Sequence, residues 1–409
     1  MKLVPAIAIA ASSAFLCGQA PPAFSSAVTT ALDGFRRGAH FEAHEALFAA
    51  AFAVDGQVSD PIALQIFTQF SPLLTNELDP KLMAWRGSPT TPDPTWAKRI
   101  SVSVPRDAIA EIVARARKTN IVILNEAHNS PRDRAFALRV AKALRPLGYK
   151  TLAAETFDNN QSETGISRTD QLKRDGFVRF NTGSYTIDPV FARFVREALA
   201  IGYEPVAYEQ TKAQDRPGSG IPEREQAQAE NLMGKIFSTR PREKTLIFVG
   251  HGHVAENPGK RLEMMATRLK RMSGVDPLTI DQTNVTDLSS PAREAYAIAA
   301  ARIGRSSTVF FERANPLVIG TLAGSVDLQV IHPRRAYVSG RPEWLAALGG
   351  KRMLIPQRLM PVKGRRLIQV FAANAPNDAV PLDQVLVSAG AARPVLFVPA
   401  GPVRFAMQQ

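Results

Sequence analysis

The sequence is poor in cysteine and in aromatic residues, and both shortages limit what the protein can be. One cysteine among 409 residues excludes an intramolecular disulfide framework and cysteine-rich zinc modules. Phenylalanine, tryptophan and tyrosine make up only 7% of the chain. The basic residues are scattered and do not interleave with these rings, as they do in many nucleic-acid-binding surfaces. A nucleic-acid partner is therefore not expected.

Several sequence motifs are also missing. Neither of the two glycine-rich nucleotide-binding patterns, the P-loop and the dinucleotide fingerprint, follows an expected strand. The Gly-x-Ser-x-Gly elbow of many serine hydrolases is absent as well. After the first twenty residues, no stretch is both uncharged and long enough to span a bilayer. We therefore expect no nucleotide cofactor, no nucleophile-elbow serine and no transmembrane span after signal removal.

The net charge and the length of the chain, in contrast, indicate what the protein could be. The chain carries 50 Lys and Arg against 37 Asp and Glu, a formal net charge of +13. This excess suits an anionic partner, or it is a diffuse property of an arginine-rich surface. A chain of 409 residues, 45% of them hydrophobic, is folded and too long for one ordinary core.

The first twenty residues have the pattern of a secretory signal. A cationic start and an apolar run over residues 3–16 precede the small residues Gly18 and Ala20. Leu16 stands where a lipoprotein signal has a small residue, which favours cleavage after Ala20 over lipid attachment at Cys17. We expect an exported protein, periplasmic or secreted, whose mature chain has no cysteine nucleophile.

The remaining sequence predicts three parts. Residues 21–104 predict a helical N-terminal segment with a proline-rich linker. Residues 105–290 alternate between helices and short apolar strands, which predicts an α/β core whose mainly parallel sheet has helices on both faces. Residues 291–409 contain β-branched runs between turn signals and predict a β-rich C-terminal region.

The expected elements can be placed by residue range. Five core strands are expected at 121–124, 151–154, 205–208, 245–249 and 277–280, and C-terminal strands at 308–311, 326–331, 367–371 and 395–398. In the N-terminal segment we expect a helix over residues 31–54. His40 and His44 lie one turn apart on it, and without a third ligand they are interpreted as helix surface.

Histidines and acids follow the expected core strands. Glu126 and His128 follow the first strand, Glu155 the second, and His251 and His253 the fourth. Ligands of open α/β sheets bind beyond the carboxyl ends of the strands, so we expect these side chains to converge on one rim.

These residue types suit the activation of water. A neutral His128 held by Glu126 would be a general base. A buried Glu155 needs a partner, and either catalysis or a structural ion pair with Arg224 would explain it. Arg224 itself could stabilise an oxyanion together with His253, or lie on a solvated helix face.

A metal is the other chemistry that this pattern allows. Glu126, His128 and His253 could hold a divalent cation, since carboxylate and imidazole are common ligands. The glycines around His251 and His253 let the chain turn sharply, and one of these two histidines could be purely structural.

Four segments together resemble the erythromycin-esterase/ChaN-like superfamily, which is related to the Tiki/TraB group. They are 121–128 followed by a helix, 152–157 (Leu-Ala-Ala-Glu-Thr-Phe), 224–232 (Arg-Glu-Gln-Ala-Gln-Ala-Glu-Asn-Leu) and 249–253. The resemblance covers about residues 105–281. The first motif of the family usually reads Gly-Glu-x-His, and Asn125 stands here in place of the glycine.

The resemblance implies alternative activities. Esterase-like members activate water with the first-motif histidine, here His128, helped by glutamates, here Glu126 and Glu155, and by a late histidine, here His253. Tiki-like members are metal-dependent proteases.

ChaN-like members are exported and bind haem iron, and Tyr208 or His251 would then be the ligand. Our first interpretation is an exported hydrolase-like protein, with or without a divalent metal, acting on an ester, lactone or peptide. The alternative is a haem- or iron-binding envelope protein without turnover.

Overall fold

The protein is described by a computed structural model. It covers residues 25–79, 82, 93–160, 165–288 and 291–409. The predicted signal over residues 1–20 lies outside the described residues. Within them, no helix is both long and apolar enough to cross a membrane.

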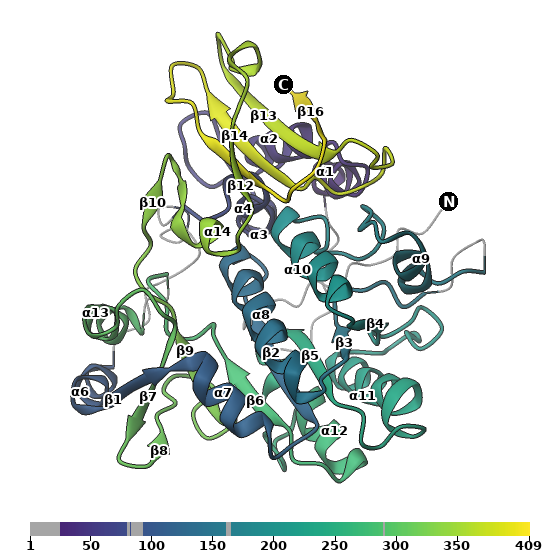
Figure 1. The fold of residues 1–409 in the computed structure, drawn as a ribbon, viewed down its shortest axis with the longest axis vertical. Helices are drawn as coiled ribbons and strands as arrows, with labels where there is room; N and C mark the ends of the chain where they lie inside the picture. The colour runs from purple at the N-terminus through teal and green to yellow at the C-terminus, as the bar shows by residue number, and fades with distance from the viewer. Residues whose placement is uncertain (1–24, 80–81, 83–92, 161–164, 289–290) are drawn as a thin grey trace.

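A mainly parallel sheet forms the centre of the molecule (Figure 1). Six strands run parallel in the order β9-β6-β2-β5-β3-β4. They are β2 (Ile121–Glu126), β3 (Thr151–Ala154), β4 (Glu204–Ala207), β5 (Thr245–Gly250), β6 (Leu278–Asp281) and β9 (Leu328–Ile331). The five predicted core strands are confirmed. They are recognisable because strands covered on both faces are continuously apolar.

The sheet continues beyond the core predicted from the sequence. Antiparallel pairing adds β7 (Thr308–Glu312) to β9, and then β1 (Val104–Asp107) and the short β8 (Asn315–Pro316) to β7. The strands β7 and β9 were expected in a separate C-terminal region. They extend the central sheet instead, so the sheet does not stop at residue 290.

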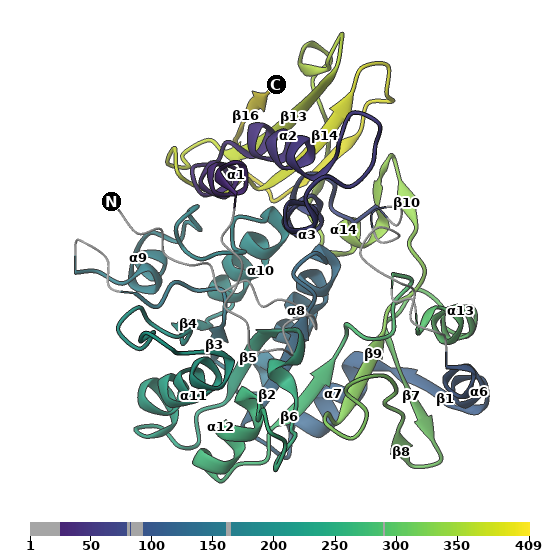
Figure 2. The same cartoon turned by 180° about the vertical axis from the view of Figure 1, so that it is seen from behind.

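Helices cover both faces of the sheet, as predicted. Alternate side chains of a strand point to opposite faces. The even-numbered apolar residues of β2 pack under α7 (Ala108–Ala116), α8 (Pro131–Leu144) and α10 (Pro189–Ala200). The odd-numbered ones pack under α11 (Ile221–Leu232) and α12 (Met265–Ser273), which Figure 2 shows from the other side.

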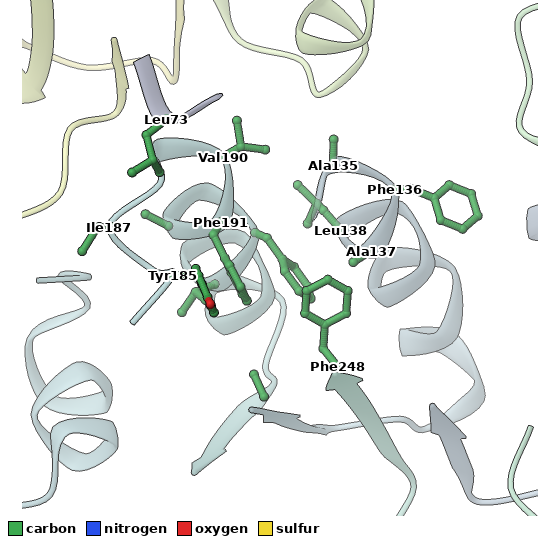
Figure 3. Close-up of a cluster of buried hydrophobic side chains, with 14 of the residues drawn as sticks. Leu73, Ala135, Phe136, Ala137, Leu138, Tyr185, Ile187, Val190, Phe191 and Phe248 are labelled. Carbon is green, nitrogen blue, oxygen red and sulfur yellow. The ribbon is translucent and has the colours of Figure 1, made fainter. Parts of the chain in front are cut away.

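Aromatic rings fill the space between α8, α10 and the sheet (Figure 3). The ring of Phe191 on α10 meets that of Phe248 on β5 edge to face, with centroids 5.4 Å apart. Phe194 stacks on Phe191 at 5.9 Å. Each such buried side chain stabilises the fold by roughly 2–3 kcal/mol.

The two ends of the chain pack against each other. The N-terminal helices are α1 (Ser26–Arg36), α2 (His40–Ala51), α3 (Pro61–Phe70) and α4 (Pro72–Thr75). They lie against an antiparallel sheet in the order β14 (Asp383–Ser388), β13 (Arg365–Ala372), β16 (Val403–Gln408). A second pair, β12 (Lys351–Leu354) and β15 (Val395–Val398), completes this β-rich part.

The predicted helix over residues 31–54 is divided in two at Gly38. This residue has a φ of +82°, and a side chain there would lie 2.5 Å from the ring of Phe180. Only glycine adopts this conformation at no steric cost, and the chain turns there between α1 and α2.

The expectation that His40 and His44 lie on a helix surface is wrong. Both are buried, His40 against the sheet of the C-terminal part and His44 against Phe67 and Ser71 at the end of α3. His40 Nδ1 lies 3.5 Å from Gln384 Oε1, and Gln384 accepts a hydrogen bond of 2.8 Å from Gln369. Burial lowers the pKa of His40 to about 4, so its ring is neutral.

The remaining elements connect these layers. They are α6 (Pro94–Val102), α9 (Arg168–Asp175), α13 (Arg293–Arg302), α14 (Glu343–Ala347), β10 (Tyr337–Val338), β11 (Arg341–Pro342) and the short turns Arg145–Leu147, Met233–Phe237, His251–Val254 and Gln357–Leu359. Pro94 was expected in a linker but begins α6, where Asp93 accepts a hydrogen bond of 2.8 Å from the backbone N–H of Thr95.

The buried Arg341 joins the two ends of the chain, which makes it a test of their packing. It donates to Asp383 at 2.7 Å and to Asn76 at 2.9 Å. Arg341→Met leaves the buried carboxylate of Asp383 without its cation, and we expect a loss of about 3–5 kcal/mol in the free energy of unfolding. The control Arg305→Met removes a side chain that is 90% exposed, and should cost less than about 1 kcal/mol. Urea unfolding measures both, and equal losses would contradict the predicted role.

Candidate active site

The predicted site residues lie at one edge of the sheet, around a crevice between β2 and β5. These strands are neighbours, but the helices that follow them, α8 and α12, cover opposite faces. Such a divergence opens a crevice at the carboxyl ends of the strands. Glu126 ends β2, Glu155 follows β3, and His251 and His253 follow β5.

His128 is fixed by contacts on several sides. Its Nδ1 is 2.9 Å from Glu126 Oε1, and its ring stacks on Tyr185 with centroids 4.1 Å apart. The ring of His251 approaches its edge at 5.1 Å. A Cβ on Gly250 would lie 2.4 Å from His128 Cε1, so the imidazole occupies the space of a missing side chain. The predicted pairing of Glu126 with His128 is present.

A buried arginine holds Glu126 from behind. Arg134 on α8 donates to Glu126 Oε2 at 2.6 Å and to Asp188 at 2.7 Å. It also donates to the carbonyl of His128 at 2.8 Å. Burial raises the pKa of Glu126, but the charge of Arg134 and the hydrogen bond with His128 outweigh this and leave the pKa below its ordinary value. Glu126 is therefore a carboxylate.

Glu155 lies between the two histidine-bearing loops. It accepts hydrogen bonds from the backbone N–H of Gly250 and from Arg224, both at 2.5 Å. Burial raises its pKa, but the charges of His253 and Arg224 outweigh burial and hold the pKa well below the usual range. Of the two explanations left open by the sequence, an ion pair with Arg224 is present.

Arg224 and His253 form a charged cluster with three glutamates. Arg224 bonds to Glu155 and to Glu209, and its Nη1 is 3.1 Å from His253 Nε2. Arg224 is therefore not on a solvated helix face. With its donors directed at carboxylates, it is also not placed to bind a substrate oxyanion.

His253 is held on its other side by the fully buried Glu225. The atoms Nδ1 and Oε1 are 2.6 Å apart, although the groups are not aligned for a hydrogen bond. Burial lowers the pKa of His253, but the charges of Glu225 and Glu155 outweigh it and raise the pKa to about 8. Sequence reasoning missed Glu225, whose only signal was its place one residue after Arg224.

A cavity of about 280 Å³ opens beside His128 and His251. Its other walls come from α3 and the residues after α4, from the loop between β2 and α8 with the start of α8, from α13, and from the segments after β6 and β9. Of the predicted site residues, His128 and His251 line it; Glu126, Glu155, Arg224 and His253 lie behind the wall.

His251 has a strained backbone. Its φ is +34°, a conformation that costs energy for any residue except glycine. The buried Asn125 holds it there by donating to its carbonyl at 2.9 Å. Burial, together with the charge of His128, lowers the pKa of His251 to about 3, so its ring is neutral. No hydrogen bond links this ring to another described residue.

Asn125 has a role that the sequence did not reveal. Besides His251, it donates to Asp281 at 2.9 Å and accepts from the backbone N–H of Gln282 at 2.8 Å. It therefore joins the ends of β2, β5 and β6, which a glycine at this position could not do. The available signal was an amide inside an otherwise apolar strand.

Asp133 is a second residue that was missed, because it reads as an ordinary helix cap. It accepts hydrogen bonds from the backbone N–H of Ala127 at 2.9 Å and from the hydroxyl of Ser130 at 2.7 Å. Its burial raises its pKa to about 7. Asp133 also lines the cavity.

Two further predictions need revision. Tyr208 was a candidate haem ligand, but it is fully buried in the core and its hydroxyl donates to the carbonyl of Phe248 at 3.3 Å. The side chain leaves the end of β4 on the core side, so it does not face the cavity. Among the described residues, no group of three His, Cys, Asp or Glu side chains is arranged to hold a metal ion. Glu126, His128 and His253 are each paired with other side chains instead.

No protein-family model and no curated protein matches the chain. Some solved structures align with it weakly. A bacterial protein toxin has 13% identity and a TM-score of 0.35 over 62% of this chain and 57% of its own. A MARTX toxin effector domain from Vibrio vulnificus has 15% identity and a TM-score of 0.31 over 58% and 54%.

The C-terminal region of Pasteurella multocida toxin, described with a thiol-protease-like catalytic triad, has 11% identity and a TM-score of 0.33 over 85% of this chain. The alignments thus span about half of those proteins, 49% in this last case. Likenesses at this level establish neither a shared fold nor a shared activity.

The charged cluster around His253 predicts a pH dependence of stability. The pKa of His253 is about 8 in the folded protein and 6.5 in the unfolded chain. The protonated ring therefore stabilises the fold fully below pH 6.5, and this contribution is lost as the pH rises through 8. We expect it to amount to about 1–2 kcal/mol. His253→Gln should flatten the decline of unfolding free energy between pH 6.5 and 8, measured by urea titration, and an unchanged slope would contradict the assignment.

Proposed function

We propose that the protein is a hydrolase in which His128 activates a water molecule in the cavity. The observation that carries this proposal is the Glu126–His128 pair at the cavity wall. Glu126 is an acceptor only, so it fixes the proton of His128 on Nδ1 and leaves Nε2 as the proton acceptor. A base held in this way can take a proton from water and return it to the leaving group.

The charges around Glu126 suit this cycle. When His128 takes a proton, the carboxylate of Glu126 stabilises the imidazolium that forms. Arg134 keeps Glu126 ionised and in place, and Asp188 holds Arg134; neither lines the cavity. The chemistry needs no side-chain nucleophile, in agreement with the absence of a reactive cysteine from the described residues.

The oxyanion of the reaction needs a hydrogen-bond donor in the cavity. Arg224 and His253 were expected in this role, but both are directed at carboxylates. We assign it instead to His251, whose neutral ring lines the cavity and forms no hydrogen bond with another described side chain. Arg224, Glu155 and His253 then act indirectly, because Glu155 holds the backbone of Gly250 next to His251.

The size of the cavity limits the substrate. Ligand sites commonly measure about 300–1,000 Å³, and this one is about 280 Å³. We therefore favour a small ester or lactone, or the reacting end of a larger molecule such as a peptide, over a bulky compound enclosed whole.

Removal of the base provides the first test. His128→Ala and Glu126→Gln should each lower kcat/KM for small nitrophenyl esters, lactones or peptides at least about 100-fold. His44→Ala is the matched control, because it removes another buried imidazole outside the cavity. Circular dichroism and unfolding curves check that the variants fold. Full activity of folded His128→Ala would exclude the proposal.

A second test displaces the base without removing it. In Gly250→Ala the new Cβ would lie 2.4 Å from His128 Cε1, so the ring must move and kcat should fall at least about tenfold. Gly252→Ala is the control two residues away, where the nearest atom, Met264 Cε, is 3.4 Å from the new Cβ. The kcat values of both variants are measured on the same substrates. Equal values would show that the position of His128 does not matter.

A further inference from the structure

One end of the β-rich C-terminal part carries an unusual surface. Arg365 at the start of β13 pairs with Ser388 at the end of β14, and Leu354 at the end of β12 pairs with Val395 at the start of β15. The loops after β12 and after β14 therefore project from the same end, which is one extreme of the long axis in Figure 1. We call residues 354–366 and 388–395 the loop pole.

The loop pole exposes aliphatic side chains. Val362 is 94% exposed and Leu354 is 53% exposed. Met407 on β16, which pairs with Ile368 near the pole, is 50% exposed. A single exposed aliphatic residue is ordinary. Here two lie on the loop pole and a third lies on the neighbouring strand β16, whereas many other apolar side chains of β12 to β16 are buried in the core.

The same surface is strongly basic. Its cations are Arg358, Lys363, Arg365, Arg366 and Arg393, and neither loop-pole segment contains an Asp or Glu. Of these five cations, only Arg365 forms an ion pair with a described residue, Glu45. Arg366 donates to Gln409 and to the carbonyl of Leu359, which neutralises no charge. Four positive charges therefore remain uncompensated around exposed aliphatic groups.

This combination selects among partners. Exposed aliphatic side chains among cations suit the boundary between anionic headgroups and acyl chains of a lipid surface. A nucleic acid offers the charge but has no use for aliphatic tips, and the loop pole has no aromatic ring on which bases could stack. A second copy of the chain would bring the same positive charges and be repelled.

We propose that the loop pole docks the protein on a membrane surface that contains anionic lipids. Val362 enters the headgroup region, and Arg358, Lys363, Arg366 and Arg393 bind the lipid phosphates. The proposal is independent of the catalytic one, because none of these residues lines the cavity.

Vesicle sedimentation of the full chain tests the proposal. The protein should bind vesicles of phosphatidylcholine with about 30 mol% phosphatidylglycerol and should dissociate as NaCl is raised. Lys363→Glu/Arg393→Glu should weaken this binding at least about tenfold. The control Arg117→Glu/Lys118→Glu makes the same change of charge at the exposed end of α7, at the other end of the molecule (Figures 1 and 2), and should stay within about twofold.

A second pair of variants tests the contribution of the exposed aliphatic side chains to vesicle binding. Val362→Asn should weaken vesicle binding, whereas Val102→Asn, which replaces a valine that is 73% exposed on α6, should not. Three outcomes would overturn the proposal: no preference for anionic over pure phosphatidylcholine vesicles, equal losses in both charge variants, or tighter binding to a DNA duplex than to vesicles with no effect of Val362→Asn.

Discussion

The candidate site depends on a guanidinium that is buried between two carboxylates. Arg134 lies under the end of β2, where it binds Glu126 of that strand and Asp188 at the start of α10. Removing one member of such a buried set typically costs about 3–5 kcal/mol, because a charge is left without a partner. The same contacts that orient His128 through Glu126 thus also join α8 to α10. Stability and the geometry of the site cannot be separated at this point of the molecule.

Glu155 extends this control to the other side of the crevice. Its carboxylate binds the backbone of Gly250, whose missing side chain leaves room for His128, and it approaches His253 and Arg224 on the far side. The loop after β5 is therefore fixed by two contacts: Glu155 binds the backbone N–H of Gly250, and Asn125 binds the carbonyl of His251. This explains how His251 can keep a strained backbone next to the cavity, since the surrounding contacts determine its conformation.

The sequence predicts what depends on local pattern, and the structure adds what depends on distant partners. The parallel strands are recognisable because they are apolar throughout, and the rim residues because they follow those strands. Of the two carboxylates that bind Arg134, Asp188 lies 54 residues away in the sequence, and no local signal reveals this pairing. Tyr208 was misassigned because a strand end does not show to which face its last side chains turn. His40 and His44 were placed on a surface because the elements that cover them, β14 for His40 and α3 for His44, lie elsewhere in the sequence.

The packing of the two ends has a consequence for synthesis. The helices α1 to α4 emerge from a ribosome long before β13, β14 and β16, which pack against them. The partner of His40, Gln384, lies 344 positions further along the chain. Phe35 and Phe67 belong to a hydrophobic core that also includes residues of the C-terminal strands. Until β13, β14 and β16 are made, the nascent chain exposes an apolar surface that aggregates readily or that a chaperone must shield. Because α3 also lines the cavity, we expect this wall of the cavity to take its final position only after β13, β14 and β16 have been made.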